Sequence, residues 1–310
     1  MNGTATRRLG ASDLHITPLG IGTAPIGSTP EWRIYWGPQD EGAAVRAIQA
    51  AIDLGINWID TAPFYGWGRA EQIVGRAIHS RRDDVYVFTK CGTLRAPDGG
   101  WIQTLTPGSM RREIEQSLRD LGTDRVDLYQ FHDPDPDTPI EESLECARAL
   151  VQEGKVRYVG ISNHPCDLIE RAAAFPEVVS NQFELSLLAP DHERDELPCT
   201  TGLGLGALAW SPQASGFLTD GFDIEQLDPS DFRRRHRFAT DTRVPHVRAA
   251  LAEVAAERGA SLSHVALAWV ISRPGITGAI VGIRDEREAA SMAEALAFGL
   301  TDDEASRLTA

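Results

Sequence analysis

The sequence predicts an α/β fold in which eight strands and the helices between them close into a (β/α)8, or TIM, barrel. Short apolar runs recur along the whole chain and alternate with amphipathic segments of helical periodicity. Parallel strands that are covered on both faces are apolar almost throughout, as these runs are. No change in composition divides the 310 residues, and a barrel of this length commonly forms one domain. We therefore expect a single barrel domain over residues 1–310.

Eight runs are strand candidates. In chain order they are 19–24 (LGIGTA), 56–62 (INWIDTA), 85–91 (VYVFTKC), 126–132 (VDLYQFH), 156–162 (VRYVGIS), 178–183 (VVSNQF), 205–210 (LGALAW) and 278–283 (GAIVGI). A doubly wound open sheet is the alternative, but the Gly-x-Gly-x-x-Gly turn that often follows its first strand is missing. Regular strand–helix alternation favours the closed barrel.

Helical segments fill the intervals between the strands. In 40–55, Val45, Ile48 and Ile52 form one apolar face, and Gly55 stands where a helix C-terminus is expected. The segment 139–154 repeats this scheme and ends at a glycine. Later helices are expected to begin near Pro165, Pro245, Ser261 and Glu286.

The helix expected over 106–122 has signals at both ends. Thr106 is a suitable N-cap, Pro107 suits the first turn, and Gly122 ends the run. Its buried side is expected to carry Ile114, Leu118 and Leu121.

Four segments lie outside the alternation. Residues 7–20 are short enough to form a hairpin that plugs the bottom of the barrel. Residues 25–39, 92–106 and 211–244 read as long loops, the first two with exposed tryptophans. Long loops at a barrel rim commonly build substrate pockets. The basic run 233–238 (RRRHRF) is expected to be a solvated loop face or a set of arginine anchors for an ordered flap, with no catalytic role.

Composition narrows the class of protein. The net charge of −15 disfavours nonspecific binding to nucleic acid or to an anionic membrane. No apolar stretch is long enough to span a bilayer, and residues 1–20 lack the apolar core of a signal peptide. The cysteines are scattered without metal-ligand spacing and are expected to be free thiols in a reducing cytoplasm: Cys91, Cys146, Cys166 and Cys199.

Four side chains just past strand-like runs carry the functional argument: Asp60, Tyr65, Lys90 and His132. In a parallel barrel the carboxyl ends of the strands share one rim, where chemistry takes place. A tyrosine hydroxyl can donate a proton to a carbonyl oxygen, and a neighbouring lysine held charged by an aspartate eases that transfer. A histidine can orient the carbonyl or relay the proton.

Each of the four also has an ordinary structural interpretation. Asp60 suits a cap, Tyr65 a packed aromatic, Lys90 a solvated charge and His132 a loop position. The functional interpretation depends on all four falling at the same end of separate strands.

The motifs around these residues resemble the aldo-keto reductases. The similar segments are 59–78 (IDTAPFYGWGRAEQIVGRAI), 87–90 (VFTK), 127–135 (DLYQFHDPD), 154–163 (GKVRYVGISN), 207–218 (ALAWSPQASGFL) and 264–284 (HVALAWVISRPGITGAIVGIR). They follow the family order from about Leu9 to about Leu296. The resemblance is strongest to the bacterial side of the family that includes channel-β-like and sugar-dehydrogenase-like members.

This resemblance implies a catalytic tetrad of Asp60, Tyr65, Lys90 and His132 and a nicotinamide cofactor. It implies cofactor contacts from these positions: Gly22, Thr23, Asp60, Ser162, Asn163, Gln182, Trp210, Ser211, Pro212, Gln213, Ser215, Gly216, Gly282, Arg284 and Glu288. Among them, Ser162, Asn163 and Gln182 would hold the carboxamide, Trp210 would stack on the nicotinamide, and residues 211–216 would fold over the pyrophosphate. Outside the resemblance, a capped turn at 162–163 and a core aromatic at 210 are the ordinary alternatives.

The adenosine end departs from the family pattern. Gly282 and Arg284 fit it, but Glu288 stands where arginine or glutamine is common, and Met292 where asparagine is common. A carboxylate there suits the ribose hydroxyl of NAD(H), whereas Arg284 with Arg287 suits the phosphate of NADP(H). We favour NADP(H), with NAD(H) as the alternative.

Three classes of function compete. The leading one is an NAD(P)(H)-dependent oxidoreductase of small carbonyl or alcohol compounds, with Tyr65 as general acid or base. The others are a cofactor-binding redox sensor and a metal-dependent barrel hydrolase; the latter lacks a ligand cluster at several strand ends, and we expect no metal. Trp32, Trp36 and Trp101 either line an apolar substrate pocket, together with Tyr65 and His132, or pack between loops. The sequence gives neither the substrate, the direction of reaction nor the oligomeric state.

Overall fold

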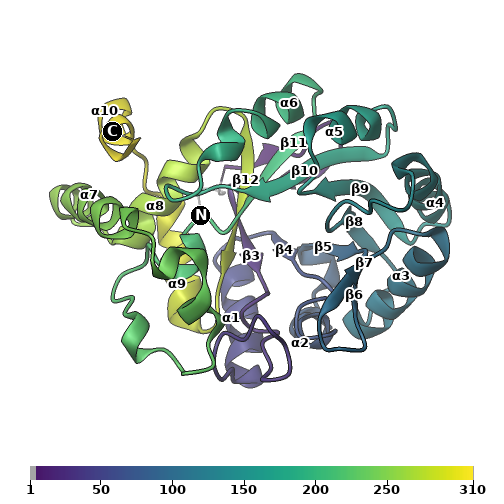
Figure 1. Ribbon diagram of the computed structural model, residues 1–310, viewed down its shortest axis with the longest axis horizontal. Helices are drawn as coiled ribbons and strands as arrows, with labels where there is room; N and C mark the ends of the chain where they lie inside the picture. Colours follow the sequence, from purple (N-terminus) through teal and green to yellow (C-terminus); the bar gives the residue numbers. More distant parts are fainter. Residues whose placement is uncertain (1–4, 310) are drawn as a thin grey trace.

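A computed structural model describes residues 5–309, and its centre is a closed barrel of eight parallel strands (Figure 1). The strands are β3 (Leu19–Gly22), β4 (Trp58–Asp60), β5 (Tyr86–Cys91), β8 (Val126–Phe131), β9 (Val156–Ser162), β10 (Val178–Glu184), β11 (Gly206–Trp210) and β12 (Ile276–Gly282). They follow one another around the barrel in chain order, and β12 closes it by pairing with β3. The predicted (β/α)8 barrel is confirmed, and the open doubly wound sheet is not formed.

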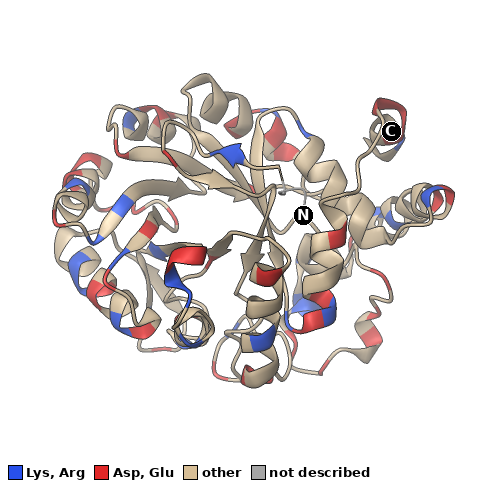
Figure 2. Cartoon of the chain, turned by 180° about the vertical axis from the view of Figure 1, so that it is seen from behind, with Lys and Arg blue, Asp and Glu red and all other residues tan. Residues whose placement is uncertain are grey.

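Helices surround the barrel (Figure 1). They are α1 (Glu41–Asp53), α2 (Arg69–Ile78), α3 (Pro107–Leu121), α4 (Ile140–Gln152), α5 (Cys166–Ala173), α6 (Glu196–Gly202), α7 (Arg243–Arg258), α8 (Leu262–Ser272), α9 (Glu286–Ala295) and α10 (Asp302–Thr309). Charges of both signs are spread over the outer helices on the face drawn in Figure 2. Within the described part of the chain, no helix combines the length and the apolar character that crossing a membrane requires.

Helix ends agree with the expected signals except at two places. Gly122 ends α3 with a positive φ of 62°, as the sequence predicts. Thr106 occupies the N-cap position of α3, but its side chain accepts no capping hydrogen bond. The helix expected near Pro245 begins at Arg243, because a proline fits within the first helical turn, where its missing N–H breaks no hydrogen bond.

The N-terminal hairpin fills one end of the barrel, as predicted. Strands β1 (Arg7–Arg8) and β2 (His15–Ile16) pair in an antiparallel manner, and the apolar side chains of this segment join a cluster with Trp58 and Phe88 inside the barrel. A Cβ on Gly20 would lie 2.0 Å from the Trp58 ring, so this position requires glycine. The closed bottom leaves the opposite, carboxyl end of the strands as the open rim. Residues 1–4, which belong to the segment 1–20 considered above for a signal peptide, lie outside the described residues.

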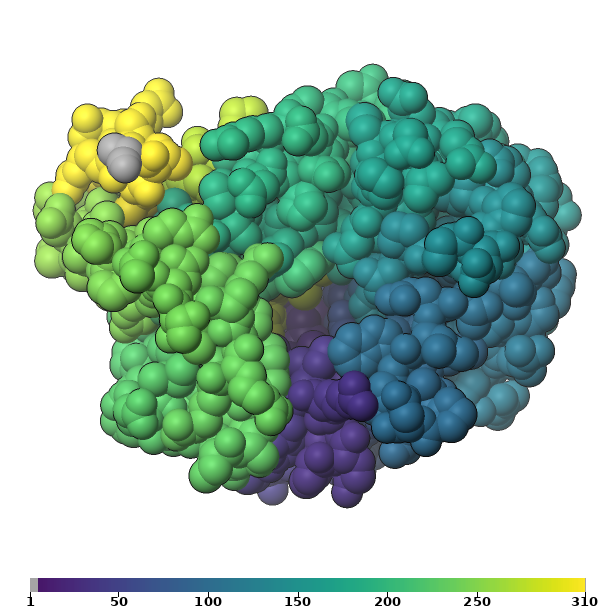
Figure 3. All heavy atoms as spheres, in the orientation of Figure 1, coloured from purple at the N-terminus to yellow at the C-terminus, as the bar shows by residue number. Residues whose placement is uncertain are grey.

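Rim loops border a hollow that is visible in Figure 3 between purple, blue and green segments. Residues 92–106, expected to be a plain loop, form the hairpin β6 (Thr93–Arg95) and β7 (Trp101–Gln103). The loops 25–39 and 211–244 are joined, because Phe232 N donates to Tyr35 O at 2.8 Å and the rings of Phe232 and Trp36 lie 4.7 Å apart. The expectation of exposed tryptophans is wrong for Trp32, which is 1% exposed because Phe64 and Tyr65 pack against it.

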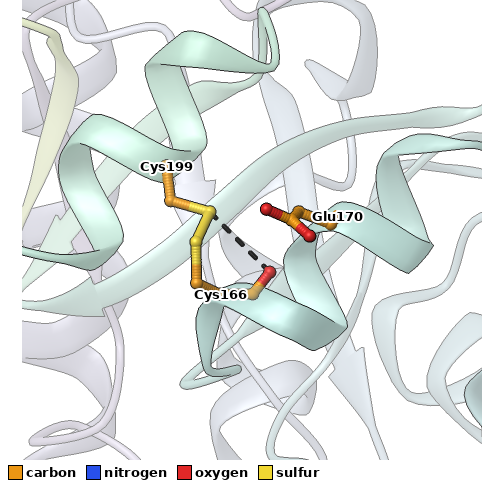
Figure 4. A group of neighbouring side chains, drawn as sticks. All are labelled: Cys166, Glu170 and Cys199. Carbon is orange, nitrogen blue, oxygen red and sulfur yellow. Dashed lines mark hydrogen bonds between the residues drawn. A yellow bond between two sulfur atoms is a disulfide. The ribbon is translucent and has the colours of Figure 1, made fainter.

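The expectation of four free thiols is also wrong. Cys166 at the start of α5 and Cys199 in α6 form a disulfide with Cα atoms 6.1 Å apart, and Glu170 lies beside it (Figure 4). Only Cys91 and Cys146, both buried, are free. The pair is 33 residues apart in the chain and becomes adjacent only when α5 packs on α6. Disulfides are uncommon in a reducing cytoplasm, so the cysteines do not favour a cytoplasmic location.

Candidate active site

The four predicted catalytic residues come together at the open rim. Asp60 ends β4, Lys90 lies in β5, His132 follows β8, and Tyr65 lies in the turn between β4 and α2. Lys90 Nζ forms an ion pair with Asp60 Oδ1 and lies 3.0 Å from the Tyr65 hydroxyl. The rings of Tyr65 and His132 have centroids 5.8 Å apart.

Burial and charge set the protonation states of this cluster. Burial by itself would lower the pKa of Lys90, but the neighbouring Asp60 and Tyr65 outweigh it and raise the pKa, so the ammonium stays charged. Burial raises the pKa of Tyr65, and the charge of Lys90 opposes that rise only in part. Burial and the charge of Lys90 hold the pKa of His132 well below its usual range. At neutral pH the cluster therefore contains a phenol, an ammonium and a neutral imidazole.

Two glutamines hold the second oxygen of Asp60. Gln130 Nε2 donates to Asp60 Oδ2 at 3.0 Å, and Gln182 Nε2 donates to the same oxygen at 2.9 Å and to Gln130 Oε1 at 2.9 Å. Sequence reasoning missed Gln130, although a polar residue within the apolar run VDLYQF was a usable signal. The resemblance had linked Gln182 to a carboxamide, whereas here its amide nitrogen serves the carboxylate of Asp60.

Asn163 links the strand ends around His132. Its Nδ2 donates to His132 O at 3.1 Å and to Asp133 Oδ1 at 3.0 Å, and its Oδ1 accepts from Trp210 Nε1 at 3.0 Å. The residue has a φ of 60°, which asparagine tolerates better than most residues. Its amide therefore fixes the Trp210 ring. The neighbouring Ser162 Oγ is buried and has no hydrogen-bond partner among residues 5–309, so a bound polar ligand would satisfy it.

A cavity of about 750 Å³ runs from this cluster to the start of α9. Its lining contains every predicted site residue except Lys90: Trp32, Trp36, Asp60, Tyr65, Trp101, His132, Gly22, Thr23, Ser162, Asn163, Gln182, Trp210, Ser211, Pro212, Gln213, Ser215, Gly216, Gly282, Arg284 and Glu288. Lys90 does not line the cavity itself, but its Nζ contacts the hydroxyl of Tyr65, which does. Two of these residues contact other parts of the protein. Thr23 Oγ1 donates a hydrogen bond to Asp60 O at 3.0 Å, and a Cβ on Gly22 would lie 2.8 Å from Ile280 Cγ2.

Backbone strain is concentrated in the loop that follows β11. Ser211, Ala214 and Ser215 have φ values between 50° and 57°, and Gly216 has a φ of 92°. Ser211 Oγ accepts from Ser215 N at 2.9 Å and stabilises this turn. Strained turns of this kind can form concave anion-binding sites from backbone N–H groups. The orphaned Ser162 hydroxyl, this loop and the elongated cavity fit a dinucleotide.

The far end of the cavity is occupied by an ion pair. Arg284 Nη2 lies 2.6 Å from Glu288 Oε1, and Arg284 N donates to Glu288 Oε2 at 2.7 Å. The Arg287 side chain is 94% exposed and lies 3.6 Å from Asp285. Met292 is buried against the cavity. A phosphate group bound here would compete with Glu288 for Arg284.

Comparisons with known proteins agree with this geometry. The profile of the aldo/keto reductase family matches residues 18–310. The aldo-keto reductase YhdN of Bacillus subtilis is 32% identical over 293 residues, covering 92% of this chain and 87% of its own. The solved glycerol dehydrogenase of Gluconobacter oxydans superposes with a TM-score of 0.86 at 30% identity, over 99% of this chain and 94% of that one. An aldo/keto reductase of Klebsiella pneumoniae, solved in complex with NADP and acetate, superposes with a TM-score of 0.76 at 29% identity, over 98% of this chain and 94% of that one.

The depressed pKa of His132 predicts a pH-dependent stability. An unfolded histidine titrates at about 6.5, so below that pH the unfolded chain binds a proton that the folded chain does not. The contribution of His132 to the free energy of unfolding is therefore complete above about pH 6.5 and declines as the pH falls, by up to about 1.4 kcal/mol per pH unit. We expect denaturant midpoints between pH 5 and 8 to decline more steeply on acidification for the wild type than for His132→Gln. Parallel curves for the two proteins would contradict a neutral imidazole at this position.

Proposed function

We propose that this chain, which belongs to the aldo/keto reductase family, is an NAD(P)(H)-dependent oxidoreductase that interconverts a carbonyl and an alcohol with Tyr65 as the general acid or base. The observation that carries the proposal is the 3.0 Å contact between Lys90 Nζ and the Tyr65 hydroxyl, with Lys90 paired to buried Asp60. Tyr65 lines the cavity, so its proton is accessible to a bound substrate. The disposition of these groups supports proton transfer to one oxygen atom.

The chain's own groups provide the proton chemistry. In reduction, the Tyr65 phenol donates its proton to the developing alkoxide, and the ammonium of Lys90 stabilises the tyrosinate that remains. Neutral His132 is suited to hydrogen-bond the substrate oxygen and hold it toward Tyr65. In oxidation the proton returns to Tyr65. Trp32, Phe64 and Trp101 form apolar walls that limit access of water to this oxygen.

A nicotinamide dinucleotide would be held along the same cavity and, when bound, would supply or accept the hydride. Ser162 offers its unpartnered hydroxyl, Trp210 a ring fixed by Asn163, and residues 211–216 the strained turn for the pyrophosphate. Asn163 and Gln182 would act mainly by positioning Trp210 and Asp60. We also propose that the substrate contacts Trp32, Trp36 and Trp101. Residues 1–310 would act as a single domain, and the reaction would need no metal.

For the cofactor we propose NADP(H) in preference to NAD(H). Arg284 lines the end of the cavity where the adenosine would bind, Arg287 is an exposed cation three residues further along the chain, and a guanidinium is a strong phosphate partner. Glu288 weakens this preference because it already pairs with Arg284.

Replacement of Tyr65 by phenylalanine removes the proton but keeps the ring. We expect kcat to fall by about 10²- to 10⁴-fold, the usual contribution of general acid–base catalysis. The Kd for NADPH, measured by fluorescence titration, should stay within about twofold, because the hydroxyl contacts Lys90 and not the dinucleotide loop.

The matched control is Tyr158→Phe in β9, whose hydroxyl accepts from Asp13 N at 3.4 Å at the closed end of the barrel. It should retain full activity. Full activity in Tyr65→Phe would refute the assignment of Tyr65. Tight NADPH binding by the wild type with no turnover of any aldehyde or ketone in a broad panel would favour the redox-sensor function instead.

The Arg284–Glu288 pair gives a test of cofactor preference. Glu288→Gln frees the guanidinium and removes a charge that repels the phosphate, so the ratio of NADH to NADPH dissociation constants should rise about tenfold. Arg284→Gln should lower the same ratio. Calorimetric titration of both variants with both cofactors measures it. An unchanged ratio in both variants would show that this pair does not contact the 2′ position.

A further inference from the structure

We propose that the substrate carries an anionic group, a carboxylate or a phosphate, which Arg33 and Arg235 bind at the mouth of the active site. This inference rests on the proposed oxidoreductase function and names the class of its substrate. A second hollow of about 500 Å³ opens beside the main cavity. Trp210, Phe232 and His236 line both, so the two spaces share a wall.

The arginines around this second hollow differ in what they already bind. Arg237 pairs with Glu184 at 2.5 Å. Arg233, which lines the main cavity, binds Asp231 at 2.7 Å, and Arg234 donates to the carbonyl oxygens of Leu227 and Glu225. These contacts agree with the predicted role of the basic run as a set of anchors for an ordered flap.

Two arginines of this hollow, Arg33 and Arg235, have no such partner within the described residues. Both are exposed, both line the second hollow, and within residues 5–309 neither forms a salt bridge or donates a side-chain hydrogen bond. Arg33 Nη1 lies 3.5 Å from where a Cβ on Gly100 would stand, so the guanidinium lies against the turn of the β6–β7 hairpin. Asp98 Oδ1 lies 3.1 Å from the same point, so this carboxylate is near Arg33 without forming a salt bridge with it.

The two residues come from different rim loops, 25–39 and 211–244, that the Phe232–Tyr35 hydrogen bond joins. That bond is two residues from Arg33 and three from Arg235, so the chain holds both cations at one mouth. The one acidic residue that lines this hollow, Glu184, is neutralised by Arg237.

His236, which also lines this hollow, is a neutral imidazole and does not change the charge of the lining. Burial and the charge of Arg237 lower the pKa of His236, and Phe238 N donates to its Nδ1 at 3.3 Å, which leaves Nε2 as the protonated nitrogen. The residues that line the second hollow thus have an excess of two positive charges, in a chain whose net charge is −15. Such a local reversal attracts and orients anions.

The wall between the two spaces sets the shape of the substrate. The reacting carbonyl lies beside Tyr65 in the main cavity, and the anion lies across Trp210 and Phe232 in the second hollow. The anionic group must therefore be separated from the carbonyl by a spacer, as in an aromatic or short-chain aldehyde acid, and cannot be adjacent to it as in a 2-oxo acid.

Matched pairs of aldehydes test this inference. One pair is 4-carboxybenzaldehyde and its methyl ester, and the other is glyceraldehyde 3-phosphate and glyceraldehyde. We expect the wild type to prefer the anionic member of at least one pair in kcat/KM, and the pair with the larger preference identifies carboxylate or phosphate. Arg33→Gln and Arg235→Gln should each lower kcat/KM for that anion by about tenfold or more, with the neutral partner within about twofold. Rising ionic strength should reduce the preference.

The control is Arg307→Gln on α10, whose partner is the exposed Glu257; it should not change the preference. Equal kcat/KM for charged and neutral members of both pairs in the wild type would overturn the inference. So would an equal loss for both members in the arginine variants, or a weaker Kd for NADPH in those variants with the preference intact, since the arginines would then support the fold or the cofactor.

Binding measurements separate failure of this inference from failure of the proposed function. If no aldehyde is turned over, calorimetric titration with terephthalate still reports the anion site. Binding by the wild type that Arg33→Gln and Arg235→Gln abolish supports the site without any catalysis. Absence of binding by the wild type would overturn it.

Discussion

Lys90 carries its ammonium group inside the barrel with no exposed surface, and an unpaired charge there would cost several kcal/mol. Asp60 supplies the opposite charge, Thr61 O accepts from Lys90 Nζ at 3.1 Å, and the Tyr65 hydroxyl is the third neighbour. Pairing alone would leave the second oxygen of Asp60 unsatisfied, and Gln130 and Gln182 bind it. The arrangement that makes the buried lysine tolerable also places a positive charge beside a phenol that faces the cavity.

The barrel makes this arrangement possible because neighbouring strands end side by side. In register, Lys90 of β5 is opposite Gln130 of β8, and Asp60 of β4 is opposite Phe88, two residues before Lys90, so the three polar residues lie within two residues of one another along the barrel. The N-terminal hairpin closes the other end with apolar side chains. Polar groups inside the barrel therefore gather toward the rim, where loops of different lengths add the tryptophans, the strained turn after β11 and the arginines of the second hollow.

The strands and the convergence of Asp60, Tyr65, Lys90 and His132 could be predicted because each depends on a local pattern, an apolar run followed by a polar residue. Gln130 was missed because its role depends on β4 and β10, which are distant in the sequence. The Cys166–Cys199 disulfide and the burial of Trp32 likewise depend on packing between separate elements. The partners of Asn163 and Arg284 needed coordinates as well, since spacing alone allowed a ligand contact or an internal one. Sequence patterns located the site, and tertiary contacts decided which polar groups are free.

In this arrangement the charge of Lys90 eases the ionisation of Tyr65. Carbon-13 NMR titration of the Tyr65 ring carbon that bears the hydroxyl measures this directly, in the wild type and in the double variant Asp60→Asn/Lys90→Met, which removes both charges together. Because Lys90 lies in contact with the hydroxyl and lowers its pKa more than Asp60 raises it, the phenol should titrate at a higher pH in the variant than in the wild type. An equal or lower titration midpoint in the variant would show that the charge of Lys90 does not ease the ionisation of Tyr65.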